Sequence, residues 1–302
     1  MRTIITGGSG LIGRAVAADL AASGREVIVL SRSPSRVTGL PARVRAEGWD
    51  GHTGRQWAGL ADGAEAIINL AGENLAARRW TPQRRQQIRD SRVMAGQAVM
   101  EALQASKQRP RVLIQASAVG YYGPHGNDTV TEVTPAGSDY LAKVCLAWEA
   151  STAGADALGV RRAIIRTGLV LSASGGALPK LVLPFRFFAG GRMGSGRQWY
   201  PWIHLADEVA AIRFLLETEA AAGAFNLTAP NPLTNAELSA TIGQVLKRPA
   251  LLPVPSVALR LALGDMATVV LDGQRALPAH LLELGYRFRF PESTAALRDL
   301  LI

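Results

Sequence analysis

The chain has 302 residues, of which 48% are hydrophobic and 19% charged, a composition that indicates a globular protein and excludes a disordered one. Its net charge of +9 comes mainly from scattered arginines with no basic stripe, so we expect no nucleic-acid partner. The single cysteine, Cys145, excludes an internal disulfide, and the sequence has no long uncharged apolar run. We expect no signal peptide, and therefore a cytoplasmic protein with no membrane partner.

The N-terminal residues have the pattern of a dinucleotide-binding turn. A short apolar run leads into Thr6–Gly13, which opens into an alanine-rich amphipathic segment over 11–23. Gly7 can make the tight turn, Gly10 lets a phosphate approach the backbone, and Gly13 allows close packing of helix and strand. The pyrophosphate would lie on unpaired N–H groups at the positive end of the helix dipole. The residues predicted to contact it are Gly7, Ser9, Gly10, Leu11, Ile12 and Gly13.

The end of the second predicted strand indicates which cofactor binds. Strand Glu26–Leu30 runs into Ser31 and Arg32, with Arg36 close by, and no acidic residue is present there. An Asp or Glu at this position would bind a free ribose 2′-hydroxyl, whereas a guanidinium favours a 2′-phosphate. The alternative is an ordinary loop arginine. We predict NADP as the cofactor, with Ser31 and Arg32 at its 2′-phosphate.

Strands and helices alternate through the first part of the chain. Residues 64–72 predict a strand that leaves at a small-residue turn, where Leu70, Ala71 and Gly72 would form a wall beside the adenosine and ribose. A long helix is predicted with Thr81 as its N-cap. The other predicted elements are strands over 111–119, 162–171 and 224–228 and helices over 81–106, 139–158 and 205–219. This alternation predicts an α/β, doubly wound parallel-sheet Rossmann fold with a smaller, mainly helical C-terminal domain.

The pattern changes after residue 171. We predict a dinucleotide-binding domain from 1–171 and 202–229, and a smaller substrate or cap domain from 172–201 and 230–302. The glycine-rich loop 190–197 carries arginines and leads into an aromatic segment, which suits an anionic substrate with a ring. The predicted substrate residues are Arg192, Arg197, Trp199, Tyr200 and His204. The alternative is that the aromatic residues join the domains, the arginines are surface charge, and the histidine makes structural hydrogen bonds.

Several motifs occur in the order typical of one family. They are Thr6–Gly13, Asn69–Glu73, Gly120–Gly123, Arg166–Gly168, Gly194–Gly196, Trp202–His204 and Leu271–Pro278. The chain resembles the atypical extended short-chain dehydrogenase/reductases, in the subfamily that is labelled NAD-dependent epimerase/dehydratase-like and has a C-terminal domain of unassigned function. The resemblance implies an NADP-binding Rossmann domain and a smaller substrate domain. It also implies cofactor contacts by Ser31, Arg32, Leu70, Ala71, Arg92 and Val170.

The catalytic residues of the wider superfamily are not clearly present. That superfamily uses Ser or Thr with Tyr and Lys, the last two spaced Y-x-x-x-K so that both lie on one helix face. Here Tyr140 is one residue too close to Lys143, and Asp139 lies four residues before the lysine. Lys143 can keep the ribose contact, while Tyr140 points about 60° away from its face.

Other hydroxyl groups follow the predicted strand over 111–119. Ser117 lies at its end, although counting back from the next tyrosine–glycine pair places Ala118 at the usual serine position. Tyr121 and Tyr122 are alternative proton donors, or they only line a pocket. No Cys, His and carboxylate spacing resembles a metal site.

Two kinds of function fit these observations. The first is an NADP(H)-dependent oxidoreductase or nucleotide-sugar-epimerase-like enzyme that transfers hydride to or from a small, anionic substrate. The second is an NADP(H)-binding sensor without turnover, which the lost Tyr–Lys spacing favours. The glycine-rich loop and the C-terminal region favour a substrate. We expect a monomer or a homodimer.

Overall fold

A computed structural model describes all residues, 1–302, and a seven-stranded sheet forms its centre. The strand order is β11-β7-β5-β4-β1-β2-β3, and every neighbouring pair is parallel. The strands are β1 (Arg2–Thr6), β2 (Glu26–Ser31), β3 (Val44–Gly48), β4 (Ala66–Asn69), β5 (Val112–Ala118), β7 (Arg161–Thr167) and β11 (Gly223–Leu227). The order reverses between β1 and β4, which confirms the predicted doubly wound Rossmann sheet.

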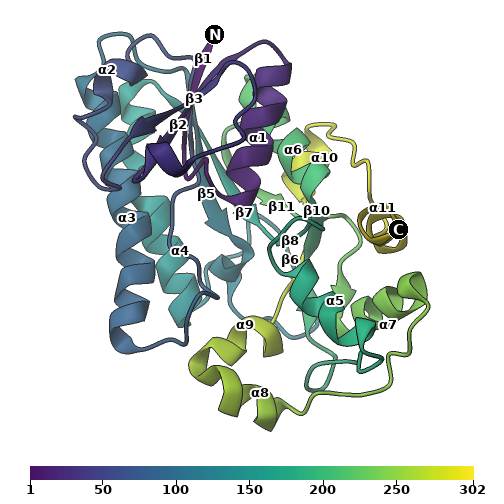
Figure 1. Ribbon diagram of the computed structural model, residues 1–302. Helices are drawn as coiled ribbons and strands as arrows, with labels where there is room; N and C mark the ends of the chain where they lie inside the picture. The colour runs from purple at the N-terminus through teal and green to yellow at the C-terminus, as the bar shows by residue number, and fades with distance from the viewer.

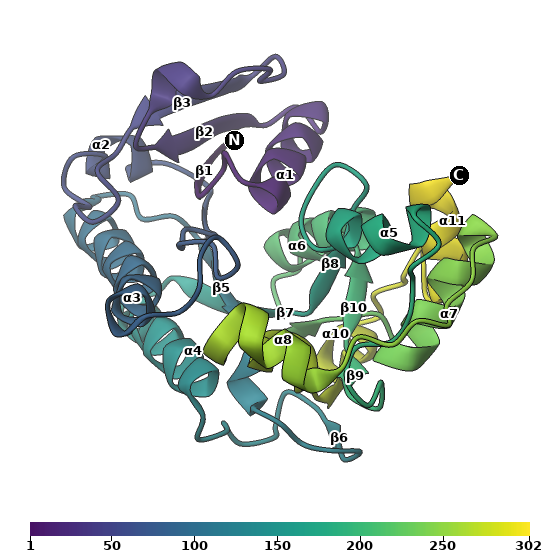
Figure 2. The ribbon, with the colours of Figure 1, turned by 60° about the horizontal axis from the view of Figure 1, so that its bottom comes forward.

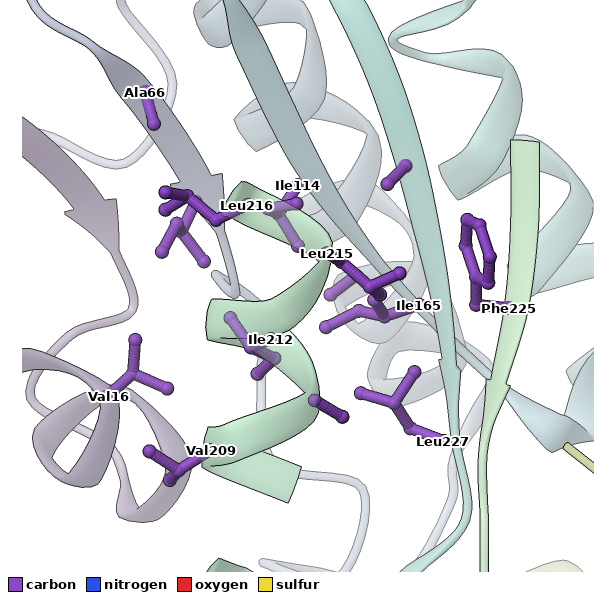
Figure 3. Packing of buried hydrophobic residues seen from close by; sticks show 14 of the residues in the cluster. Val16, Ala66, Ile114, Ile165, Val209, Ile212, Leu215, Leu216, Phe225 and Leu227 are labelled. Carbon is purple, nitrogen blue, oxygen red and sulfur yellow. The ribbon is translucent and has the colours of Figure 1, made fainter. Parts of the chain in front are cut away.

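Helices cover both faces of this sheet (Figure 1). One face carries α1 (Leu11–Ala22), α6 (Leu205–Glu217) and the short α10 (Ala279–Glu283); the other carries α2 (Ala58–Ala61), α3 (Pro82–Ala105) and α4 (Tyr140–Ala150). Helix α6 directs Leu215 toward the central strands near Ile165, while its Val209 lies beside Val16 of α1 (Figure 3). Because both faces are covered, the strands are nearly continuous apolar runs.

A second group of elements lies beside the sheet. Its helices are α5 (Leu178–Arg186), α7 (Asn235–Leu246), α8 (Ser256–Leu263), α9 (Thr268–Leu271) and α11 (Ser293–Leu301). Small strand pairs connect it to the sheet: β8 (Leu169–Leu171) with β10 (Trp202–His204), β9 (Trp199–Tyr200) with β12 (Leu233–Thr234), and β6 (Thr129–Val130) with β13 (Arg275–Ala276). A separate apolar cluster, which includes Val182, Trp202, Ile242 and Leu297, holds α5, α7 and α11 together. The predicted division into two domains stays a proposal, since α10, which it assigns to the smaller domain, packs on the central sheet through Leu281.

Two predicted elements are shorter in the structure. The strand over 162–171 divides at Gly168, where a Cβ would lie 2.3 Å from the Pro201 carbonyl oxygen, and the chain beyond it pairs with β10. The helix over 139–158 ends at Ala150 and is followed by a 3₁₀ helix, Ala153–Leu158. At that end the Ser151 hydroxyl donates to the Trp148 carbonyl (2.6 Å), a side-chain bond of the kind that competes with helix continuation.

Candidate functional site: a nucleotide cleft at the carboxyl edge of the sheet

The glycine turn has the close contacts that the spacing predicts. Gly7 adopts a φ of 67°, and a Cβ there would lie 2.7 Å from the Leu70 carbonyl group. A Cβ on Gly13 would lie 2.5 Å from the Gly7 oxygen. Both contacts are with backbone, so neither position has room for a side chain. The turn therefore packs directly on the segment that follows β4.

The N-terminus of α1 is free to hold an anion. Gly10 is its N-cap in an extended conformation, no side chain caps it, and its first turn has no acidic residue. Ser9 is exposed, and Leu11 lies against Gly175 and Gly176 of the loop after β8. Unpaired N–H groups at the positive end of a helix dipole fit a pyrophosphate. These residues therefore fit the phosphates of a dinucleotide.

Buried polar side chains fix the carboxyl ends of three neighbouring strands. The Thr6 hydroxyl donates to Asn69 Oδ1 (2.6 Å), and Asn69 Nδ2 donates to Gln115 Oε1 (2.9 Å). All three side chains are fully buried. Beyond this row Leu70 and Ala71 are partly exposed, and Gly72 is exposed at the sheet edge. The segment predicted to form the adenosine wall is thus held rigidly beside the glycine turn.

Arg32 lies at the carboxyl end of β2, in the position predicted for a 2′-phosphate ligand. Its side chain is 72% exposed, and its Nη2 lies 3.3 Å from Glu73 Oε1. Its Cδ is 3.6 Å from where a Cβ on Gly51 would lie. The Ser31 hydroxyl accepts a hydrogen bond from the Ser33 amide (3.2 Å). The arginine is therefore accessible to a ligand, and Glu73 is a partner that sequence inspection missed.

Two further predicted cofactor residues are Arg92 and Val170. Arg92 is buried directly beside Gly72, where a Cβ would lie 3.0 Å from its Cζ. One of its nitrogens donates to the backbone oxygens of Glu73 (3.1 Å) and Ile88 (2.9 Å). Val170 is half-buried in β8. Their contacts with a cofactor remain predictions.

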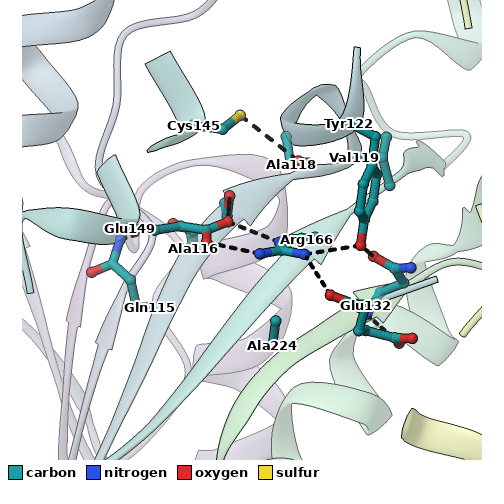
Figure 4. A network of polar contacts seen from close by, with 12 residues as sticks. Gln115, Ala116, Ala118, Val119, Tyr122, Glu132, Cys145, Glu149, Arg166 and Ala224 are labelled. Atoms are coloured by element: carbon teal, nitrogen blue, oxygen red, sulfur yellow. Dashed lines mark hydrogen bonds and ion pairs between the residues drawn. The ribbon is translucent and has the colours of Figure 1, made fainter. Parts of the chain in front are cut away.

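A buried network occupies the region below the end of β5 (Figure 4). Arg166 on β7 is 5% exposed and forms a bidentate ion pair with Glu149, with Nε–Oε1 at 2.9 Å and Nη2–Oε2 at 3.0 Å. The Ser117 hydroxyl also donates to Glu149 Oε1 (2.6 Å). The proton of Ser117 is thus directed into the protein, so its position does not support the predicted catalytic role.

Tyr122 belongs to the same network. Its side chain is 1% exposed, so its position does not support the predicted role as a proton donor. The hydroxyl donates to Asn226 Oδ1 (2.7 Å) and accepts from Arg166 Nη1 (3.1 Å). Burial raises the pKa of Tyr122 to about 12, which Arg166 opposes only in part. A phenol with two protein partners and this pKa is a structural group.

Tyr121 differs from Tyr122 in its exposure and in the hydrogen bonding of its hydroxyl group. Its ring is partly exposed and stacks on Arg166, with Cζ 3.4 Å from the ring centroid. Of the five tyrosines, the other four all bond through their hydroxyls to protein groups. The Tyr121 hydroxyl alone remains free at the carboxyl edge of the sheet.

The orientation of α4 separates Lys143 from the site. Leu141 and Cys145 lie beside Gly120, and the Cys145 thiol donates to the Ala118 carbonyl (3.7 Å), so this face of α4 meets the end of β5. Lys143 is exposed and lies about 200° around the helix from Leu141. Its position therefore does not support the predicted contact with the ribose.

Tyr140 has a role in joining parts of the chain. Its hydroxyl donates to the Arg85 carbonyl (2.8 Å), and its ring packs edge-on against Trp80 at 5.2 Å. Met266, between α8 and α9, packs against the same small cluster. Asp265 forms an ion pair with Arg85 at 2.7 Å. The segment 256–271 thus packs beside α3 and α4, as Figure 2 shows, and Tyr140 belongs to the cluster that Met266 of this segment contacts.

Two of the five predicted substrate residues, Tyr200 and His204, are buried. Tyr200 is buried and donates to the Val270 carbonyl (2.8 Å). His204 caps α6, because its Nδ1 accepts from the Ala206 amide (3.0 Å); the ring proton is then on Nε2, 3.3 Å from Asp299. Burial lowers the pKa of His204, which keeps the ring neutral. His204 lines a cavity of about 560 Å³ on the α1 and α6 side of the sheet, not on the α4 side.

The other predicted substrate residues lie nearer the surface. Arg192 donates to the Ser195 carbonyl (2.9 Å) and lines a cavity of about 220 Å³ beside α7. The Trp199 indole donates to Asn127 (3.1 Å), and Arg275 Cζ lies 4.8 Å from its ring centroid. Arg197 is exposed. The structure therefore does not gather the five residues into one pocket, and their substrate role remains a prediction.

Two general properties complete the description. None of the helices is long and apolar enough to cross a membrane. No group of three His, Cys, Asp or Glu side chains has the arrangement of a metal site.

Comparison with known proteins identifies the family. The model of the NAD dependent epimerase/dehydratase family matches residues 3–228, and a domain of unknown function matches residues 254–300. The chain is 40% identical to the chloroplastic epimerase family protein SDR39U1 homolog of Arabidopsis thaliana, over 100% of this chain and 87% of that protein. It is also 40% identical to the epimerase family protein SSP1921 of Staphylococcus saprophyticus, over 98% of each.

A solved structure agrees over the whole chain. The crystal structure of human epimerase family protein SDR39U1 with NADPH superposes with a TM-score of 0.90 at 33% identity and covers 99% of both chains. The resemblance to an atypical short-chain dehydrogenase/reductase is thereby confirmed, together with the nucleotide-binding Rossmann fold. The chain belongs to the NAD dependent epimerase/dehydratase family.

Proposed function

We propose that this protein is an NADP(H)-dependent oxidoreductase, epimerase-like in its fold, that transfers hydride to or from a small, anionic substrate. One observation carries the proposal: a helix N-terminus with no cap or acid and an exposed arginine, Arg32, lie together where open parallel sheets bind dinucleotides. The NADPH in the human relative supports the same cofactor.

In this proposal, some residues bind the cofactor and another transfers a proton. The N-terminus of α1 would hold the pyrophosphate, and Arg32 with Ser31 the 2′-phosphate. A bound nicotinamide supplies or accepts the hydride. Tyr121 Oη would then exchange a proton with the substrate oxygen, because it is the one tyrosine hydroxyl that is not bonded to protein. Exposed Arg197 and Arg275 supply positive charge for an anionic substrate.

A screen for turnover tests this proposal. NADPH oxidation at 340 nm would be followed against carbonyl acids, sugar phosphates and nucleotide sugars. With an accepted substrate, Tyr121→Phe should lower kcat by about 10²–10⁴-fold, the usual contribution of a positioned acid or base. Tyr140→Phe is the matched control and should keep most of the activity. A large loss in Tyr140→Phe alone, with folding and NADPH affinity unchanged, would refute the assignment.

The second candidate function is an NADP(H) sensor without turnover. The positions of Ser117, Tyr122 and Lys143 favour it, since none of them offers a free catalytic group to the cleft. Tight NADPH binding without oxidation by any compound of the panel, and unchanged by Tyr121→Phe, would favour the sensor over the enzyme.

A further inference from the structure

The ion pair between Arg32 and Glu73 lies at the carboxyl edge of the sheet, beside the glycine turn. In the sheet, β1 has β2 on one side and β4 on the other. Arg32 follows β2 and Glu73 lies in the segment after β4, so their 3.3 Å contact spans the carboxyl end of β1. The glycine turn begins at that same end. A nucleotide ribose bound there would meet the ion pair directly.

The two partners of this pair are held very differently. Arg32 is 72% exposed, and Glu73 is its only side-chain partner. Glu73 is 30% exposed and also pairs with Arg84, whose nitrogen lies 3.1 Å from Oε2 and whose side chain is 11% exposed. The Arg84 hydrogen bond, with the charge of Arg32, holds the pKa of Glu73 below its usual range. Glu73 is therefore ionised and keeps one cation when Arg32 leaves.

Arg32 has room to change partners. Its stem runs past Gly51, which has a φ of 97° and no side chain to confine it. In contrast, the Glu73 amide is fixed by the Ser91 hydroxyl (3.1 Å), and Arg84 is fixed by the Asn74 carbonyl (2.7 Å). The mobile partner is thus the arginine and the fixed partner is the carboxylate.

We propose that Glu73 is a specificity-determining residue, which holds Arg32 in the free protein and yields it to the 2′-phosphate of NADP(H). The inference rests on the proposed function, because it requires Arg32 to bind that phosphate. A phosphate monoester carries close to two negative charges and pairs with a guanidinium in bidentate geometry, so it displaces an exposed carboxylate.

The same carboxylate acts in opposite directions on the two cofactors. After the exchange, ionised Glu73 remains beside the phosphate and repels it. Toward a cofactor without the phosphate, Glu73 offers an acceptor for the 2′-hydroxyl, as an acidic residue does in other dinucleotide sites. Glu73 therefore narrows the preference for NADPH over NADH that Arg32 creates.

Calorimetric titration of four proteins tests the proposal: the wild type, Glu73→Gln, Arg32→Gln and Glu26→Gln. Glu26 is the matched control, an ion-paired carboxylate with 42% exposure at the amino end of β2. The ligands are NADPH, NADH, adenosine 2′,5′-bisphosphate and AMP. We expect Glu73→Gln to bind NADPH and the bisphosphate about two- to fivefold more tightly, the fold-change that corresponds to one exposed ion pair. NADH and AMP should bind equally or more weakly.

Each result discriminates. Opposite effects on the two cofactors also exclude a general disturbance of the fold, which would weaken both. If Arg32→Gln removes the preference for NADPH but Glu73→Gln does not strengthen NADPH binding, this inference is overturned and the proposed cofactor stands. If Arg32→Gln leaves the preference for NADPH over NADH unchanged, both this inference and the proposed NADP(H) cofactor are overturned. An equal gain in Glu26→Gln would attribute the effect to net charge and would also overturn the role of Glu73.

Discussion

Glu208 should make the stability of this protein fall as pH rises. The residue lies in the first turn of α6 and is fully buried. Its Oε1 accepts a hydrogen bond from the Thr167 hydroxyl (2.8 Å), while Oε2 has no partner. Burial raises the pKa of Glu208 to about 8, and the hydrogen bond from Thr167 opposes this only in part. The carboxyl group is therefore neutral in the folded protein at pH 7.

The size of the effect follows from proton linkage. The folded pKa of about 8 is above the unfolded value of 4.5, so the folded state binds the proton more tightly. The resulting stability is fully present below the unfolded pKa and is lost as pH rises through the folded pKa. At 1.36 kcal/mol per unit, the loss between pH 5 and 7.5 amounts to about 3 kcal/mol.

Urea unfolding of the wild type and Glu208→Gln from pH 5 to 9 measures this loss. Glutamine keeps the acceptor for Thr167 and does not titrate; its amide at the unpartnered position costs a constant about 1–3 kcal/mol. The free energy of unfolding of the variant, relative to that of the wild type, should therefore rise by about 3 kcal/mol between pH 5 and 7.5 and should stay constant well above pH 8. Glu217→Gln, a change at a 48% exposed residue of the same helix, should show no such trend. Parallel pH profiles for the wild type and Glu208→Gln would refute the argument.

Two further predictions concern the buried network and the glycine turn. Arg166→Met leaves Glu149 buried without its cation, so the free energy of unfolding should fall by about 3–5 kcal/mol. Adding Glu149→Gln to this variant should recover part of the lost stability. Strictly additive losses of the two changes in urea unfolding would contradict the pairing. Gly13→Ala would place a Cβ 2.5 Å from the Gly7 oxygen, so the turn must shift and the affinity for NADPH should fall more than about tenfold. Gly59 has open space around it, so Gly59→Ala should bind NADPH with the affinity of the wild type in the same titration.

The elements near the N-terminus could be predicted because their signals are local. Strand β1, the glycine turn and α1 follow one another directly, and Thr81 caps α3 as its residue type suggests, accepting from the Arg84 amide (3.1 Å). The cofactor residues on these elements are adjacent in sequence for the same reason. In contrast, Arg32 and Glu73 are 41 residues apart, and only the strand order brings them together.

The surroundings of the predicted catalytic residues depend on partners that are distant in sequence. Tyr121 and Tyr122 are neighbours in sequence, but Tyr122 is the buried one, and its hydroxyl bonds to Asn226, 104 residues away. One signal was available: Arg166 interrupts an apolar strand, and Glu149 follows a tryptophan in an apolar helix. A charge in such a context needs a partner of opposite sign, so the two could have been matched.

The Arg166 network gives structural partners to the polar side chains near the end of β5. Arg166 on β7 bonds to Glu149 on α4 and to Tyr122, and Glu149 also accepts from Ser117 on β5. Two predicted catalytic residues, Ser117 and Tyr122, are therefore structural groups in this network. The same guanidinium stacks on Tyr121 and presents that ring at the sheet edge. In the proposed function, proton transfer depends on Tyr121, which the Y-x-x-x-K pattern does not include. A search for function guided by that pattern would select Tyr140, which seats the segment 256–271 instead.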